Sequence, residues 1–276
     1  MKKILYLASI IALGTTISSC GWLSEGDLND SIDTASFGSI CLDNLEFETE
    51  HKHFRDSLEA NGSEAYYDID IDVPVSGPQA LVDSIKDMIA KHLGKSWKGK
   101  KDFSDEMLAH YANEYYNETI LASDSEYGFN SGLDMTFSVI TNTEKFVTYE
   151  IEGYDYRGGA HGLPFSNGVT FDKTDGSQLG WEIFTDTTAL APIFKKYIAG
   201  YFHETSDVEI DEILFDEPAK KFPLPATAPW LVEDGVAIIY SAYEIAPYAS
   251  GLPTATIPTA AIEKYLTPKA KELLKK

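Results

Sequence analysis

The chain has 276 residues, of which 43% are apolar, and a formal net charge of −22 at pH 7. That apolar share can supply a sizeable buried core, which excludes a disordered chain. The acidic balance excludes nucleic acid and anionic lipid surfaces as partners. It suits a basic protein or a cationic peptide, although acidity that serves only solubility is an alternative.

The first 38 residues have the pattern of export and anchoring signals. Two lysines precede the apolar run Ile4–Ile17, which is shorter than the roughly 20 residues of a transmembrane helix. The run ends in Ile-Ser-Ser-Cys-Gly at 17–21, which resembles a lipobox. We expect residues 1–19 to be a lipoprotein signal peptide, Cys20 to carry the lipid and 20–38 to be a flexible tether. An ordinary secreted protein is the alternative.

Lipidation would hold the folded part outside the cytoplasm, anchored to the membrane through the lipid. Gly21 resembles the residue found there in lipoproteins sorted to the outer membrane of cells with two membranes. Because Lys2 and Lys3 would leave with a signal that has no acids, the mature charge would be −24. The lipid would use Cys20, so Cys41 is expected to be a small buried hydrophobe without an intramolecular disulfide.

The segment 39–156 predicts strands and two helices. Residues 39–54 suggest a strand, and in 63–75 apolar residues alternate with Asp68, Asp70 and Asp72, as in a strand with one wet face. Helices are predicted from Pro78 to Gly94 and over 104–122, and strands over 133–142 and 145–156.

The segment 157–276 predicts a hairpin and then helices around a strand. Asp175-Gly176 marks a hairpin turn, helices follow near 190–202 and 207–214, and 236–245 has the pattern of a buried central strand. A last helix is predicted over 261–266, with a basic tail after Pro268. The order favours an α+β protein of two small domains, 39–156 and 157–276, with mostly antiparallel sheets and packed helices.

The sequence lacks the usual catalytic motifs, and we expect a protein that is not an enzyme and has no cofactor. His51 and His53 would share one face of their strand, and the three aspartates would share one face of theirs. No further metal ligand can be identified for either group, so exposed side chains are favoured over a metal site. The stretch Tyr154–Gly162 is unusual because it holds three glycines, one arginine and His161. A structural turn, a binding loop and catalysis by His161 are the alternatives.

Two stretches resemble a known family. YDYRGGAHGLPFSNGVTFDKTDGSQL at 154–179 and DGVAIIYSAYEIAPYASGLPTATIP at 234–258 resemble the C-terminal domain of the lysozyme-sensing anti-sigma factor, which also occurs in many bacterial lipoproteins. Residues 39–150 are similar to the domain that precedes it there, and that precedes the catalytic domain of some peptidoglycan deacetylases. The chain departs from the anti-sigma factor in having no sigma-binding segment, so signalling is not implied.

The resemblance implies binding, because the related domain binds lysozyme, a compact basic protein. Interfaces favour Tyr, Trp and Arg anchors, and the candidate binding residues lie in two loops: Tyr156, Arg157 and His161 in one, Pro247 and Tyr248 in the other. We expect the loops to adjoin if their strands are neighbours. Trp181 and Trp230 are alternative anchors, more typical of core. A peptidoglycan or carbohydrate-binding module and a hydrolase remain the alternative functions.

Overall fold

The computed structural model describes residues 46–94, 97–121, 128–205, 210–215 and 222–275, and Asp43–Lys276 form one compact unit. The expected signal, tether and lipidated Cys20, together with Cys41, lie outside the described residues. Among the described residues, no helix is both long and apolar enough to cross a membrane.

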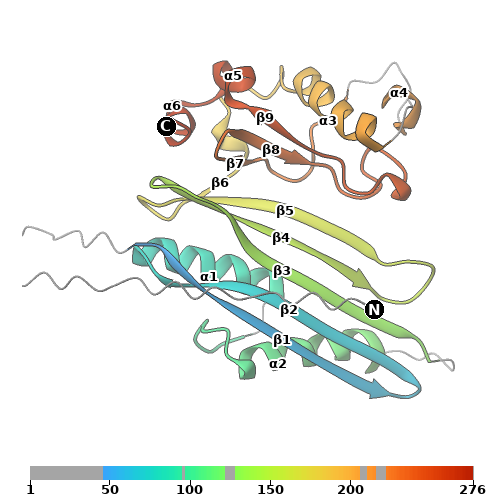
Figure 1. The fold of residues 1–276 in the computed structure, drawn as a ribbon. Coiled ribbons are helices and arrows are strands. Elements are labelled where there is room, and N and C mark those ends of the chain that lie inside the picture. Colours follow the sequence, from blue (N-terminus) through green and yellow to red (C-terminus); the bar gives the residue numbers. More distant parts are fainter. Residues whose placement is uncertain (1–45, 95–96, 122–127, 206–209, 216–221, 276) are drawn as a thin grey trace, which may run out of the picture. The chain divides into compact units, whose positions relative to one another are not determined.

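A six-stranded sheet forms the first part of the fold, with its strands in chain order (Figure 1). Its members are β1 (Glu48–Ala60), β2 (Ser63–Ser76), β3 (Asn130–Asn142), β4 (Phe146–Tyr156), β5 (Leu163–Asp172) and β6 (Gln178–Leu179). Neighbours are antiparallel except β2 and β3, which are parallel. Parallel neighbours need a long crossover, and here the crossover contains α1 (Gln79–Leu93), α2 (Asp105–Tyr116) and the π-helical turn η1 (Asn117–Leu121).

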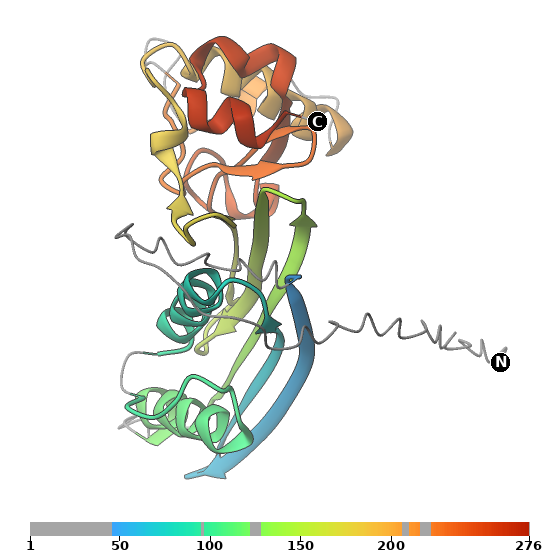
Figure 2. The same ribbon diagram turned by 90° about the vertical axis from the view of Figure 1, so that its left-hand side faces the viewer.

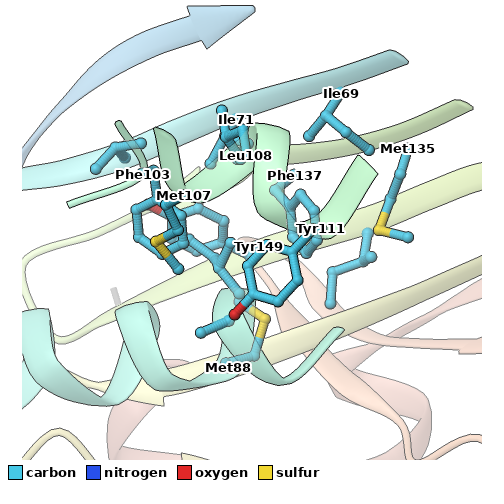
Figure 3. Packing of buried hydrophobic residues seen from close by; sticks show 14 of the residues in the cluster. Ile69, Ile71, Met88, Phe103, Met107, Leu108, Tyr111, Met135, Phe137 and Tyr149 are labelled. Carbon is cyan, nitrogen blue, oxygen red and sulfur yellow. The ribbon is translucent and has the colours of Figure 1, made fainter. Parts of the chain in front are cut away.

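The helices α1 and α2 lie on one face of this sheet (Figures 1 and 2). The alternating pattern of β2 explains this, because Tyr67, Ile69 and Ile71 point to the helices and are buried, whereas the intervening aspartates point to the opposite face. Figure 3 shows Phe137 and Tyr149 of the sheet among Met88 of α1 and side chains of α2. We call the sheet face that α1 and α2 do not cover the open face.

A second core surrounds a three-stranded antiparallel sheet of β7 (Trp230–Val232), β8 (Gly235–Ile239) and β9 (Thr254–Pro258). β8 is the central strand and is buried throughout, as its apolar run predicts. Around it lie η2 (Trp181–Ile183), α3 (Ala191–Thr205), α4 (Ile210–Ile213), η3 (Tyr248–Ser250), α5 (Thr259–Ile262), η4 (Glu263–Tyr265) and α6 (Pro268–Leu273).

Part of the open face is covered by β7. The buried Thr148 hydroxyl of β4 donates to the carbonyl of Leu231 (2.7 Å), and the Leu231 amide donates to the hydroxyl of Thr170 on β5 (2.9 Å). Gly168 leaves room for Trp230, since a Cβ there would lie 2.2 Å from the indole ring. The β4–β5 side of the open face thus joins the second core, and the β1–β3 side does not take part in these contacts.

The α+β prediction is confirmed, with differences of detail. The β2–β3 pair is parallel, because two helices separate these strands in the chain. The predicted basic tail is helix α6, whose Ala270 and Leu273 are buried in the second core while its lysines face outward. The boundary predicted between 156 and 157 falls between β4 and β5, which pair in one sheet; as a limit between independent folding units it stays a prediction.

Candidate functional site

The glycine-rich loop 157–162 joins β4 to β5 and is held in shape by two tyrosines. Gly158 and Gly159 have φ angles of 86° and 93°, which favour glycine. The Tyr156 hydroxyl donates to the carbonyl of Gly159 (3.0 Å), and the Gly162 amide donates to the Tyr154 hydroxyl (2.6 Å). Two tyrosine hydroxyls of β4 thus bond directly to the backbone of the loop.

The two predicted loops meet. His161 stacks on Tyr248, with ring centroids 3.9 Å apart and an interplanar angle of 23°. The Tyr248 hydroxyl donates to the carbonyl of Gly162 (3.0 Å), and Pro247 sits directly before Tyr248 as the residue that caps η3. Tyr243 adds a third ring, whose hydroxyl lies 3.2 Å from Nε2 of His161. We call the group Tyr154, His161, Gly162, Tyr243 and Tyr248 the loop junction.

Both ring nitrogens of His161 have partners. Nδ1 lies 3.0 Å from the Gly162 carbonyl, which can only accept, so Nδ1 carries a proton and donates. In the neutral ring, Nε2 then accepts from the Tyr243 hydroxyl. The contacts thus fix the orientation of the His161 ring.

Tyr243 combines exposure with an unusual backbone. Its φ is 67°, in the left-handed region, and half of its surface is exposed (50%). The left-handed conformation costs a non-glycine residue about 1–2 kcal/mol of conformational free energy. Because the ring is half exposed, its burial offsets little of that cost. Sequence reasoning missed Tyr243, because it placed this residue in a strand predicted over 236–245, whereas β8 ends at Ile239 and Tyr243 lies in the following turn.

Arg157 points away from the loop junction. Its Nε donates to Asp155 (2.8 Å), an Nη lies 3.8 Å from Glu118, and the guanidinium lies 5.5 Å from the ring centroid of Tyr115. The Tyr115 hydroxyl in turn donates to Asp155 (3.3 Å) and to the Tyr156 carbonyl (3.2 Å). Burial first, and then the Asp155 charge, raise the pKa of Tyr115, so its hydroxyl stays protonated.

A pocket of about 710 Å³ opens beside this arginine, between the end of α1, α2 and strands β3–β5. Its lining is mixed, with Arg157, Asp155 and Glu118 next to Tyr111 and Tyr115. The predicted site residues therefore separate into two places: His161, Pro247 and Tyr248 at the loop junction, and Arg157 at the pocket. Tyr156 lies between them through its bonds to the loop and to Tyr115.

The open face is rich in carboxylates. The strand registers place seven acids on it, from β2, β3 and β4 in turn: Glu64, Asp68, Asp70, Asp72, Asp134, Glu150 and Glu152. Burial first, and then repulsion from Glu152, raise the pKa of Glu150, so the ionised carboxylate is disfavoured there.

Of the alternative anchors, Trp230 is buried as expected, and Trp181 is partly buried against the second core.

Comparison with known families divides the chain into two matched parts. Residues 60–164 match the model described as Deacetylase PdaC, and residues 182–260 match that of a protein of unknown function, DUF3298. Along the chain, a segment similar to PdaC (the PdaC segment) precedes a segment similar to DUF3298 (the DUF3298 segment). This confirms the two-part resemblance expected from the sequence. His161 falls in the PdaC segment, and Tyr243 and Tyr248 fall in the DUF3298 segment, so the loop junction is where the two meet.

Solved structures share this fold. A DUF3298 family protein from Bacteroides fragilis has a TM-score of 0.65 and 23% identity, covering 84% of this chain and 98% of that one. A DUF3298 family protein from Pseudomonas aeruginosa has a TM-score of 0.57 and 16% identity, covering 82% and 97%. No curated protein matches the chain.

Proposed function

We propose that this chain is a lipid-anchored binding module of the bacterial envelope, and that its partner is a compact basic protein of the c-type lysozyme kind. The observation that carries the proposal is the loop junction. Two loops separated by more than eighty residues bring His161, Tyr243 and Tyr248 together in an aromatic cluster at the surface. Clustered aromatic side chains are typical anchors of protein interfaces.

The backbone of Tyr243 supports a binding role. A strained residue persists when the surrounding structure enforces it, and such residues concentrate at functional sites. The ring of Tyr243 reaches Tyr248 at 5.6 Å between centroids and remains half exposed. Its strain is accounted for if a partner buries the exposed half.

Charge supports a basic partner. The seven carboxylates of the open face give it a negative potential, and the pKa of Glu150 is raised first by burial and then by repulsion from Glu152. A basic protein would relieve that repulsion, and complementary charge would speed encounter.

The test is a calorimetric titration of the full-length chain with a c-type lysozyme at low and at moderate salt. We expect saturable binding that weakens with salt, and a loss of at least about tenfold in Tyr243→Ala and in Tyr248→Ala, as for interface anchors. Tyr197→Ala, a partly buried tyrosine on α3, is the matched control and should bind like the parent. Absence of binding by a folded chain, or equal loss in all three variants, would refute the proposal.

The pocket favours a second candidate, a peptidoglycan fragment. Tyrosine rings beside an arginine and carboxylates suit a sugar ring with an amide or carboxylate substituent. Titration with a soluble muropeptide would then give binding that depends little on salt and is lost in Arg157→Gln but kept in Tyr243→Ala. The opposite dependence on these two variants would assign the ligand to the loop junction.

A further inference from the structure

The hairpin of β1 and β2 brings together side chains that the sequence keeps apart. Its register pairs His51 with Asp72, His53 with Asp70 and Arg55 with Asp68, all on the open face. The two histidines alone, or the three aspartates alone, would be ordinary exposed residues. The strand pairing turns them into one mixed cluster of imidazoles and carboxylates.

The ligand atoms of this cluster already have the spacing of a metal site. Nδ1 of His53 lies 3.1 Å from Oδ1 of Asp70 and 3.6 Å from Oδ1 of Asp68, and the three ligand atoms are all within 4.8 Å of one another. Tetrahedral Zn²⁺ with bonds of about 2.0–2.2 Å separates its ligand atoms by about 3.3–3.6 Å. Small side-chain rotations would bring all three atoms onto one ion.

His51 provides a fourth ligand atom, the second nitrogen of the set, and its ring orientation is already supported by a neighbouring carboxylate. Its Nε2 lies 3.2 Å from Oδ1 of Asp70, while its Nδ1 lies 3.3 Å from Oδ1 of Asp72. The other oxygen of Asp72 accepts the backbone amide of Val139 on β3 (3.0 Å). A carboxylate that holds the far nitrogen of an imidazole is the usual second shell of a histidine metal ligand.

We propose that His53, Asp68 and Asp70, with His51 as the fourth ligand, form a surface site for a divalent transition metal ion of the Zn²⁺ class. Two imidazoles with two carboxylates suit Zn²⁺, whereas Ca²⁺ and Mg²⁺ prefer oxygen ligands alone. Arg55 occupies only Oδ2 of Asp68 (3.1 Å), which leaves Oδ1 for the ion. The site shares no residue with the loop junction.

The experiment is equilibrium dialysis of the full-length, untagged chain against Zn²⁺, with metal counted by mass spectrometry and affinity measured by competition with a chromophoric chelator. We expect one high-affinity Zn²⁺ per chain, and a visible absorption spectrum typical of tetrahedral nitrogen and oxygen ligands when Co²⁺ replaces it. His53→Gln and Asp70→Asn should each weaken Zn²⁺ binding by more than about tenfold, since loss of a second-shell partner alone costs about 10- to 100-fold.

Two further variants separate this site from other sources of binding. Asp72→Asn should weaken Zn²⁺ binding by about tenfold through the second shell while leaving the two carboxylate ligands in place. His110→Gln is the matched control, because His110 is also partly exposed and lies 3.6 Å from a carboxylate of Glu114 on α2. Binding that is absent, that survives His53→Gln, that falls equally in His110→Gln, or that Ca²⁺ displaces at equal concentration would each overturn the proposal.

Discussion

At Tyr243, the effect of backbone strain on stability can be separated from the effect of losing the side chain on binding, by comparing a glycine with an alanine variant. The φ of 67° at this position costs a side chain about 1–2 kcal/mol, which Tyr243→Gly removes and Tyr243→Ala keeps. Glycine itself costs about 0.5–1 kcal/mol relative to alanine through chain entropy. Both variants lose the same hydroxyl contact to His161 and the same ring packing. The glycine variant should therefore be more stable than the alanine variant by about 1 kcal/mol, the reverse of their order in ordinary helix or strand.

The assay is thermal unfolding followed by circular dichroism, with lysozyme titration in parallel. For a unit of this size, 1 kcal/mol corresponds to about 2–4 °C in Tm, so Tyr243→Gly should melt about 2–4 °C above Tyr243→Ala. Both should lose lysozyme binding, because both lose the ring. An alanine variant as stable as the glycine variant would show that residue 243 stores no strain and would remove that support for the binding site.

Three further predictions test the packing and charge around the site. Gly162→Ala should destabilise by about 1–3 kcal/mol, because its Cβ would lie 2.6 Å from the ring of Tyr154; Gly200→Ala, in α3 with open space around it, should instead stabilise by about 0.5–1 kcal/mol in thermal melts. Burial first, and then the hydrogen bond to its carboxylate partner on β3, raise the pKa of Tyr66 from 10.0 to about 12. Stability from this group is complete below pH 10 and is lost as the pH rises to about 12, and Tyr66→Phe should flatten that part of the alkaline unfolding profile. Because burial and a neighbouring carboxylate raise the pKa of Glu150, Glu150→Gln should raise the denaturation midpoint at neutral pH and have no such effect at a pH low enough to protonate the acid.

Local patterns predicted the elements well, because alternation and caps act over a few residues. The alternation in β2 and the continuous apolar run in β8 both identify real strands, one with a wet face and one central. The direction of neighbouring strands was harder to predict from the sequence. The β2–β3 pair is parallel because the crossover helices return the chain to the end of the sheet at which β2 begins. Hairpin signals elsewhere in the sequence carry no information about that path.

The candidate site could be predicted only in part, since it depends on contacts between distant segments. His161 and Tyr248 do meet, as expected if their strands lie close. Arg157 does not join them, because it continues the face of Asp155 that turns toward the helices, as period two would have indicated. The carboxylate partners of His51 and His53 could not be predicted from the sequence, because the register between β1 and β2 decides which aspartate lies opposite each histidine.

The distribution of counter-charge on the open face indicates where a basic partner would dock. At the β1 edge, Asp68 already faces Arg55, and Asp70 lies between two imidazoles. Glu150 on β4 instead has a weak contact with a serine hydroxyl (3.4 Å) and a raised pKa. A partner's lysine or arginine gains most from the carboxylate with the least local compensation. That carboxylate lies on β4, the strand that ends at the glycine-rich loop, so charge and aromatic anchors involve the same strand.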